Sequence, residues 1–303
     1  MSDLANPIFH SEDKAREWLE ARVWPNGPVC PHCGTVDQAT RLEGKSHRPG
    51  LLQCNACREP FTVTVKTLYE RSKIPLHKWL HATHLLMASK KGMSALQIGR
   101  MLGMSKKTAW FVCHRIRESL RETPKGQLGG EGKAVEADES YVGGKAKNRA
   151  HRKPAPKKAV FALIERGGEV RTQPVRDVSA KTLGPIIGDN IDKASTLMTD
   201  TALVYEKIGE DFVAHGTVNH SANEYARAEW FHTNSAENYF SILKRGINGV
   251  YHHVSEQHLH RYCGEFDFRY NNRTITDSER MHKSVGGIVG KRLTYRRPDK
   301  AQG

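Results

Sequence analysis

The sequence predicts a mixed α/β (α+β) protein in which small N-terminal modules precede a larger domain. Two Cys-x-x-Cys pairs, with twenty residues between them, lie near the N-terminus and have the spacing of a zinc site. Apolar residues then recur at helical spacing from residue 75 to residue 120. Beyond residue 133, strand patterns come first and alternating strands and helices follow, as in a layered α/β or α+β domain.

Changes in composition along the chain predict its division into segments. The expected segments are an N-terminal helix at 1–24, a zinc ribbon at 25–70, a helix-turn-helix region at 71–122, a Gly-rich linker at 123–133, a larger α/β domain at 134–290 and a basic tail at 291–303.

The charge balance favours a polyanionic partner. Lys and Arg total 47 against 33 for Asp and Glu, a formal net charge of +14, and each cation placed near a phosphate releases a counterion. A membrane surface is the other polyanion. No stretch approaches the roughly 18 to 20 apolar residues of a spanning helix, and the first residues lack the pattern of a signal peptide. We therefore expect double-stranded DNA as the partner, no membrane partner, and a cytoplasmic, nucleoid-associated location.

Four of the six cysteines form the two pairs, Cys30 with Cys33 and Cys54 with Cys57. In a reducing cytosol such pairs favour a metal over a disulfide. Four thiolates at tetrahedral reach make a closed structural site for one Zn²⁺ and stabilise a segment too small for a core of its own. The pattern indicates metal strongly and function weakly, because zinc ribbons bind DNA, RNA or protein.

A helix-turn-helix pattern follows the ribbon. Ser94 is placed to cap a helix, Gly103 provides a tight turn, and Ser105 is placed to cap a second helix. The second helix begins with basic residues that would face the DNA major groove in this motif. The alternative is an ordinary helical hairpin with a solvated basic face. The predicted DNA-contacting residues of this segment are Lys106, Lys107, Thr108 and Arg115.

Two further regions are basic. Residues 145–158 contain seven Lys or Arg and two prolines, a composition that predicts a basic loop at a strand end rather than packed structure. In this basic segment the residues predicted to contact DNA are Arg149, Arg152 and Lys153. A helical pattern that begins near residue 235 adds Arg245. Arg269, Asn271, Asn272, Arg273 and the tail KRLTYRR are candidates for contacts with the DNA backbone.

Three acidic residues stand in contexts that suit metal-dependent chemistry. Asp138 lies in the first strand of the larger domain, Asp200 ends the short apolar strand STLMTD, and Glu237 begins a helix on which Lys244 follows two turns later. Carboxylates suit two Mg²⁺ or Mn²⁺ ions, which assist phosphoryl transfer. Any one of these acids alone is more simply a surface carboxylate. Glu139 competes with Asp138, because a one-residue change of strand phase exchanges the side chain that faces the site.

At this point the chain resembles a known family. The segments VEADESYVGGK and LMTD, and the long block FHTNSAENYFSILKRGINGVYHHVSEQHLHRYCGEFDFRYNNR, are similar to bacterial insertion-sequence transposases of the ISXO type, which have an N-terminal zinc ribbon and a DDE-type domain. The resemblance covers nearly the whole chain. It implies that residues 134–290 form a ribonuclease-H-like catalytic domain in which Asp138, Asp200 and Glu237 are the acidic triad and Lys244 is the basic residue after the third acid.

The resemblance also implies an activity. Such enzymes bind terminal inverted repeats, nick DNA with water and join the freed 3′-hydroxyl to target DNA, so a homodimer or larger assembly is expected to hold two ends. Some members carry Asn or His at the third acidic position, whereas Glu237 is present here. Two alternatives remain open at this stage: a DNA-binding regulator built from the ribbon and the helix-turn-helix, and a ribonuclease-H-like nuclease that lacks strand transfer.

Overall fold

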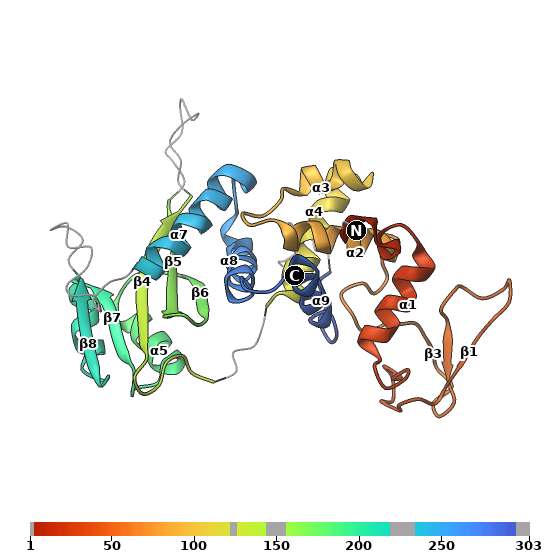
Figure 1. The fold of residues 1–303 in the computed structure, drawn as a ribbon, viewed down its shortest axis with the longest axis horizontal. Helices are drawn as coiled ribbons and strands as arrows, with labels where there is room; N and C mark the ends of the chain where they lie inside the picture. Colours follow the sequence, from red (N-terminus) through yellow and green to blue (C-terminus); the bar gives the residue numbers. More distant parts are fainter. Residues whose placement is uncertain (1–2, 122–125, 144–155, 219–233, 295–303) are drawn as a thin grey trace, which may run out of the picture. The chain divides into compact units, whose positions relative to one another are not determined.

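The computed structural model describes residues 3–121, 126–143, 156–218 and 234–294. The chain divides into two compact units: the first combines Met1–Leu120 with Ile275–Gly303, and the second is Arg121–Thr274. Figure 1 labels their helices and strands. Within the described ranges, no helix has both the length and the apolar composition required to cross a membrane.

The first unit consists of a small antiparallel sheet and several helices. Strand β2 lies between β1 and β3 in the three-stranded sheet. The elements in chain order are η1 (Asp3–Ala5), η2 (Pro7–Phe9), α1 (Glu12–Val23), β1 (Ala39–Arg41), β2 (Leu52–Cys54), β3 (Pro60–Phe61), α2 (Leu76–Ala88), α3 (Ala95–Leu102), α4 (Lys106–Ser119) and α9 (Asp277–Gly286).

The helix-turn-helix pattern forms as its caps predict. The Ser94 hydroxyl accepts the Gln97 N–H at the start of α3, and the Ser105 hydroxyl accepts the Thr108 N–H at the start of α4, so each cap satisfies an amide that the helix leaves open. Between them, Gly103 takes a left-handed conformation, with φ of 62° and ψ of 43°, which glycine adopts without steric cost.

The last helix, α9, belongs to the first unit, whereas the sequence pattern placed it in a domain running to residue 290. Its N-terminus carries a capping box between Thr276 and Glu279. It packs against α2 and buries Met281 and Val285, and the segment that follows forms a bridge between Thr67 and Val289. The physical reason for the difference is that the apolar stripe of α9 finds its partner among the N-terminal helices.

The second unit is an α/β arrangement around one sheet. Its elements in chain order are β4 (Ala134–Val142), β5 (Lys158–Glu165), β6 (Val170–Val175), α5 (Ala180–Asn190), β7 (Thr196–Asp200), η3 (Leu203–Tyr205), α6 (Glu206–Gly209), β8 (Ala214–Val218), α7 (Asn234–Gly246), the π-helix η5 (Ile247–Tyr251) and α8 (Glu256–Asn271). The short helices η3 and α6 follow β7 directly.

The sheet has the strand order β6-β5-β4-β7-β8. The first three strands pair antiparallel, and β7 and β8 run parallel to β4. One face packs on α7 and α8 through Val160, Ala162 and Phe240, and the opposite face packs on α5 through Leu163 and Leu183. An antiparallel meander extended by parallel strands, with helices on both faces, is the ribonuclease-H-like arrangement, so the fold prediction is confirmed.

Candidate functional site

The four paired cysteines come together in the first unit through two similar turns. In the first turn the Cys30 carbonyl accepts the Gly34 N–H at 2.9 Å, and in the second the Cys54 carbonyl accepts the Arg58 N–H at 3.0 Å. Gly34 and Arg58 both have positive φ, 81° and 64°. Each turn therefore presents both of its thiols to one point.

The cysteine cluster fits a structural Zn²⁺. The Sγ atoms of Cys30 and Cys57 lie 3.7 Å apart, those of Cys33 and Cys54 lie 3.6 Å apart, and all four lie within 4.8 Å of one another. Tetrahedral zinc with bonds of about 2.3 Å to sulfur requires sulfur atoms about 3.8 Å apart. The arrangement thus matches a closed site with four protein ligands.

The predicted DNA-contacting residues of α4 separate into two groups. Lys106 and Lys107 are exposed and Thr108 is half-buried in the first turn of the helix. Arg115 is instead held inside the unit: its Nε donates to the Leu293 carbonyl at 3.1 Å, and its guanidinium lies 4.7 Å from the Phe111 ring centroid. Burial lowers the pKa of Arg115. The exposed residues of α4 are therefore Lys106 and Lys107 in its first turn and Trp110 in the next.

In the second unit, Asp138 and Asp200 lie at matching positions on neighbouring parallel strands. Strand β4 pairs with β7 with Glu136 opposite Met198, and this register, continued by two residues, places Asp138 beside Asp200. Both strands run in the same direction and both side chains are half-buried. Asp200 is the last residue of β7, and Asp138 lies in the middle of β4, two residues beyond its last pair with β7. In open sheets, sites form at the carboxyl ends of parallel strands.

Helix α7 brings Glu237 to the same face of the sheet. The carboxylate of Glu136, which is fully buried, accepts the Ala236 N–H at 3.0 Å and the Arg166 Nε–H at 2.9 Å. Glu136 and Asp138 are two residues apart in β4 and share one face. Glu136 thus holds the first turn of α7, which carries Glu237, against the strand that carries Asp138.

The acidic residues interact electrostatically. Burial, then the neighbouring Glu139, Asp200 and Glu237 carboxylates, raise the pKa of Asp138 to about 7, against the effect of the Glu139 N–H that its carboxylate accepts. The carboxylate oxygens of Asp138, Asp200 and Glu237 do not, however, all lie within 4.8 Å of one another, as the four cysteine sulfurs do. Among the described residues, only the cysteine cluster gathers at least three possible ligand atoms within 4.8 Å.

The structure distinguishes Asp138 from Glu139. Val135 and Ala137 pack in the core on the α5 side of the sheet, so strand alternation directs Glu139 to that side as well. There the buried Tyr205 hydroxyl donates to the Glu139 carboxylate at 2.5 Å. Asp138 is therefore the residue that shares a face with α7. Burial raises the pKa of Glu139 too.

Sequence reasoning missed Glu136 and Tyr205 as parts of this region. The two-residue spacing between Glu136 and Asp138 was a usable signal for a shared strand face. For Tyr205 the local sequence carries no such signal, because its contact with Glu139 depends on where the chain turns after β7.

Lys244 and Arg245 are exposed at the end of α7. Lys244 lies two turns after Glu237, on the same flank of the helix. The Arg245 guanidinium donates to the Ser241 hydroxyl at 2.8 Å. Three predicted DNA contacts, Arg149, Arg152 and Lys153, lie outside the described residues.

Three of the four residues near the end of α8 that were predicted to contact the DNA backbone make contacts inside the unit. Arg269 and Asn272 are buried, and Arg269 pairs with the buried Glu265 on the same helix. Asn271 exchanges two hydrogen bonds with the Val170 backbone. These groups satisfy polar atoms inside the unit; of the four, Arg273 is exposed.

Two family models match the chain. A model described as an ISXO2-like transposase domain matches residues 127–271, and one described as a transposase zinc-ribbon domain matches residues 10–59.

Similar proteins include an uncharacterized protein in transposable element ISH50 from Halobacterium salinarum, 26% identical over 283 residues, which cover 86% of this chain and 91% of that protein. An uncharacterized transposase-like protein from Haemophilus influenzae is 27% identical over 123 residues, which cover 40% of this chain and 98% of that protein.

Among solved structures, a pre-cleavage Mos1 transpososome is 10% identical with a TM-score of 0.19, covering 64% of this chain and 74% of that one. A TM-score this low does not establish a shared fold.

Proposed function

We propose that this chain is an insertion-sequence transposase that binds the terminal inverted repeats of its element and catalyses metal-dependent strand cleavage and strand transfer. Its matches to an ISXO2-like transposase domain and a transposase zinc ribbon support this proposal. The observation that carries this proposal is the placement of Asp138 and Asp200 on neighbouring parallel strands, with Glu237 on a helix fixed to the same strand. A regulator needs no such arrangement.

In this proposal the three carboxylates bind the catalytic ions. Two divalent ions, Mg²⁺ or Mn²⁺, would supply activation of the attacking oxygen and stabilisation of the leaving oxygen. Burial and the neighbouring carboxylates raise the pKa of Asp138, and bound cations would offset this repulsion. Glu136 orients Glu237 through the first turn of α7. Lys244, exposed on the same flank of that helix, neutralises a phosphate beside the reacting one.

DNA recognition in this proposal belongs to the N-terminal turn of α4. Lys106 and Lys107 are exposed there and would enter the major groove, as second helices of helix-turn-helix motifs do. Arg115 contributes indirectly by holding α4 to the Leu293 backbone. Two ends must be held together during transposition, so the active species is a dimer or a larger assembly on DNA.

One assay tests the proposal. The purified full chain is incubated with Mg²⁺ or Mn²⁺, DNA carrying the element's ends and a supercoiled target. Joined products support transposition, cleavage without joining would replace it by a nuclease, and binding without cleavage would replace it by a regulator. Asp200→Asn should abolish cleavage while leaving DNA affinity unchanged. The matched control is Asp211→Asn, since Asp211 is 65% exposed and pairs with Lys193.

A further inference from the structure

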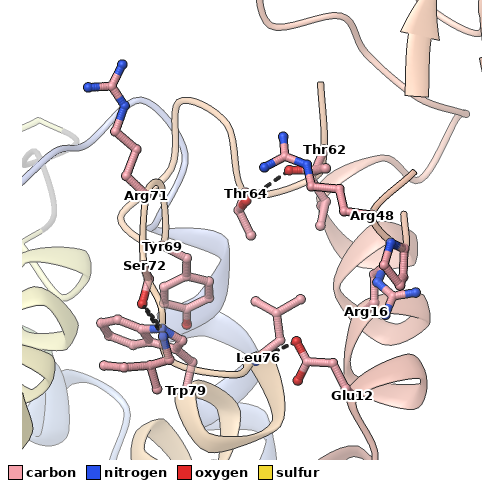
Figure 2. A pocket seen from close by; sticks show the side chains of 13 residues that line it. Glu12, Arg16, Arg48, Thr62, Thr64, Tyr69, Arg71, Ser72, Leu76 and Trp79 are labelled. Carbon is pink, nitrogen blue, oxygen red and sulfur yellow. Dashed lines mark hydrogen bonds between the residues drawn. The ribbon is translucent and has the colours of Figure 1, made fainter. Parts of the chain in front are cut away.

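A cavity of about 270 Å³ opens in the first unit, and none of the paired cysteines lines it (Figure 2). Its walls come from α1, from the chain just before β2, from the segment that follows β3, and from the start of α2. It is lined by side chains of the ribbon segment and of the helices, so a ligand here would contact both parts of the unit.

Positive charge dominates the lining. Arg16, Arg48 and Arg71 face a single acid, Glu12. Glu12 is already committed: one carboxylate oxygen accepts the Leu76 N–H at 3.0 Å, and the other accepts the His77 N–H at 3.3 Å. These are amides at the start of α2, where no side chain of the helix itself provides a cap.

The arginines differ in how far they are available. Arg16 packs against Gly50: a Cβ added at Gly50 would lie 2.3 Å from the Arg16 Cδ. The Arg16 guanidinium pairs with Asp13, which is 74% exposed. Arg71 is 80% exposed and pairs loosely with Glu70 at 3.7 Å. Arg48 is exposed and has no acidic partner within 4.0 Å in the described part of the chain.

Hydroxyl groups complete the polar side of the cavity. The Thr62 and Thr64 hydroxyl oxygens are 3.0 Å apart, and Arg48 lines the same cavity (Figure 2). Each hydroxyl carries one hydrogen and their mutual bond uses one of the two, so one hydrogen remains to donate outward. A guanidinium next to a hydroxyl donor is a common combination for a phosphate oxygen.

The floor does not suit a base. Trp79 is 1% exposed and Tyr69 is 3% exposed, and their rings stack on each other with centroids 4.7 Å apart. A nucleobase therefore has no open aromatic face to stack on, which is the usual source of affinity for a flipped or single-stranded base. The polar donors remain, and they match the sugar-phosphate backbone.

We propose that this cavity binds one phosphodiester group of the DNA backbone, with Arg48 and Arg16 supplying charge and the Thr62–Thr64 pair supplying a hydrogen bond. The site rests on the proposed function, since it presupposes that the protein binds DNA. A contact of this kind fixes the position of the duplex without reading its sequence.

The test is ethylation interference on DNA carrying an element end, combined with a salt titration of affinity, using the full chain. Arg48→Ala should lose interference at one phosphate and lower the slope of log K against log salt by about 0.9 for that contact. The double variant Thr62→Val/Thr64→Val should weaken binding with the slope unchanged, because no charge is removed. The control Arg176→Ala removes a charge that is 88% exposed in the second unit. It should change neither the interference pattern nor the slope of log K against log salt.

The outcomes separate the two proposals. If wild-type protein binds DNA and Arg48→Ala keeps both the full interference pattern and the slope, the cavity proposal is overturned while the proposed function stands. If the wild type does not bind DNA, the proposed function fails. Arg48→Lys guards against a folding defect: it keeps the charge and the slope but loses the bidentate fork, so its affinity should fall between those of the wild type and Arg48→Ala.

Discussion

Replacing Glu136 by Ala should destabilise the second unit strongly. The Glu136 side chain is fully buried and accepts hydrogen bonds from Arg166 at 2.9 Å and from the Ala236 amide at 3.0 Å. Removing one partner of a buried ion pair costs roughly 3 to 5 kcal/mol, and the amide of Ala236 loses its acceptor as well. Such a loss is a large share of the 5 to 15 kcal/mol that typically stabilises a folded protein.

The assay is urea denaturation of the full chain combined with hydrogen–deuterium exchange of α7. In Glu136→Ala the amides of α7 should lose protection while β1–β3 keep theirs. Glu136→Gln retains an acceptor for Ala236 and loses the charge opposite Arg166, so it should show an intermediate loss. Glu169→Ala is the control, because Glu169 is 64% exposed and should change stability by no more than about 0.5 kcal/mol. A Glu136→Ala protein with wild-type stability and intact α7 protection would refute the reasoning.

Three more predictions follow from particular residues. Burial raises the pKa of Asp267 to about 7, above the roughly 3.9 of an unfolded chain, so the stability of the wild type should fall as the pH rises from about 4 to 7. Asp267→Asn cannot titrate and should lack this fall, whatever stability it loses with the acceptor of the Thr172 N–H; parallel curves of stability against pH for the two proteins would contradict this. Chelation of zinc or Cys54→Ala should unfold residues 30–61, since zinc provides most of the folding free energy of such modules. Metal content and hydrogen exchange measure this effect. Unchanged hydrogen exchange after metal removal would argue against a structural ion. A Cβ at Gly99 would lie 3.0 Å from the Met104 carbonyl oxygen and 3.1 Å from the Ala109 Cβ, so Gly99→Val should cost about 1 to 3 kcal/mol by forcing α3 from α4, and a wild-type melting temperature would show that the contact tolerates expansion.

Local signals in the sequence were sufficient for much of the fold. The paired cysteines predicted the ribbon, and the caps Ser94 and Ser105 with Gly103 predicted both helices and their turn. In the hairpin between β5 and β6, Gly167 takes a φ of 73°, which glycine adopts without steric cost. In each case the decisive chemistry lies within a few residues, so no knowledge of distant partners was required.

Long-range packing decided what the sequence left open. The alternation in β4 puts Asp138 and Glu139 on opposite faces, but only the packing of α7 selects Asp138 as the residue beside Glu237. Likewise, the apolar stripe of α9 gives no indication that α2 covers it. The predicted DNA contact Arg115 has the right charge and spacing, yet its guanidinium is held by the Leu293 backbone. None of these partners can be read from neighbouring residues.

The return of the chain at Ile275 sets the order in which the protein can mature on the ribosome. The second unit is one continuous stretch, whereas the first unit is interrupted by it. Helix α2 can pack against α9 only after the whole second unit has been synthesised, because α9 follows that unit in the chain. The first unit can therefore be completed only after the second unit has been synthesised. A nascent chain that stops before residue 277 contains every residue of the second unit but lacks the helix that packs against α2.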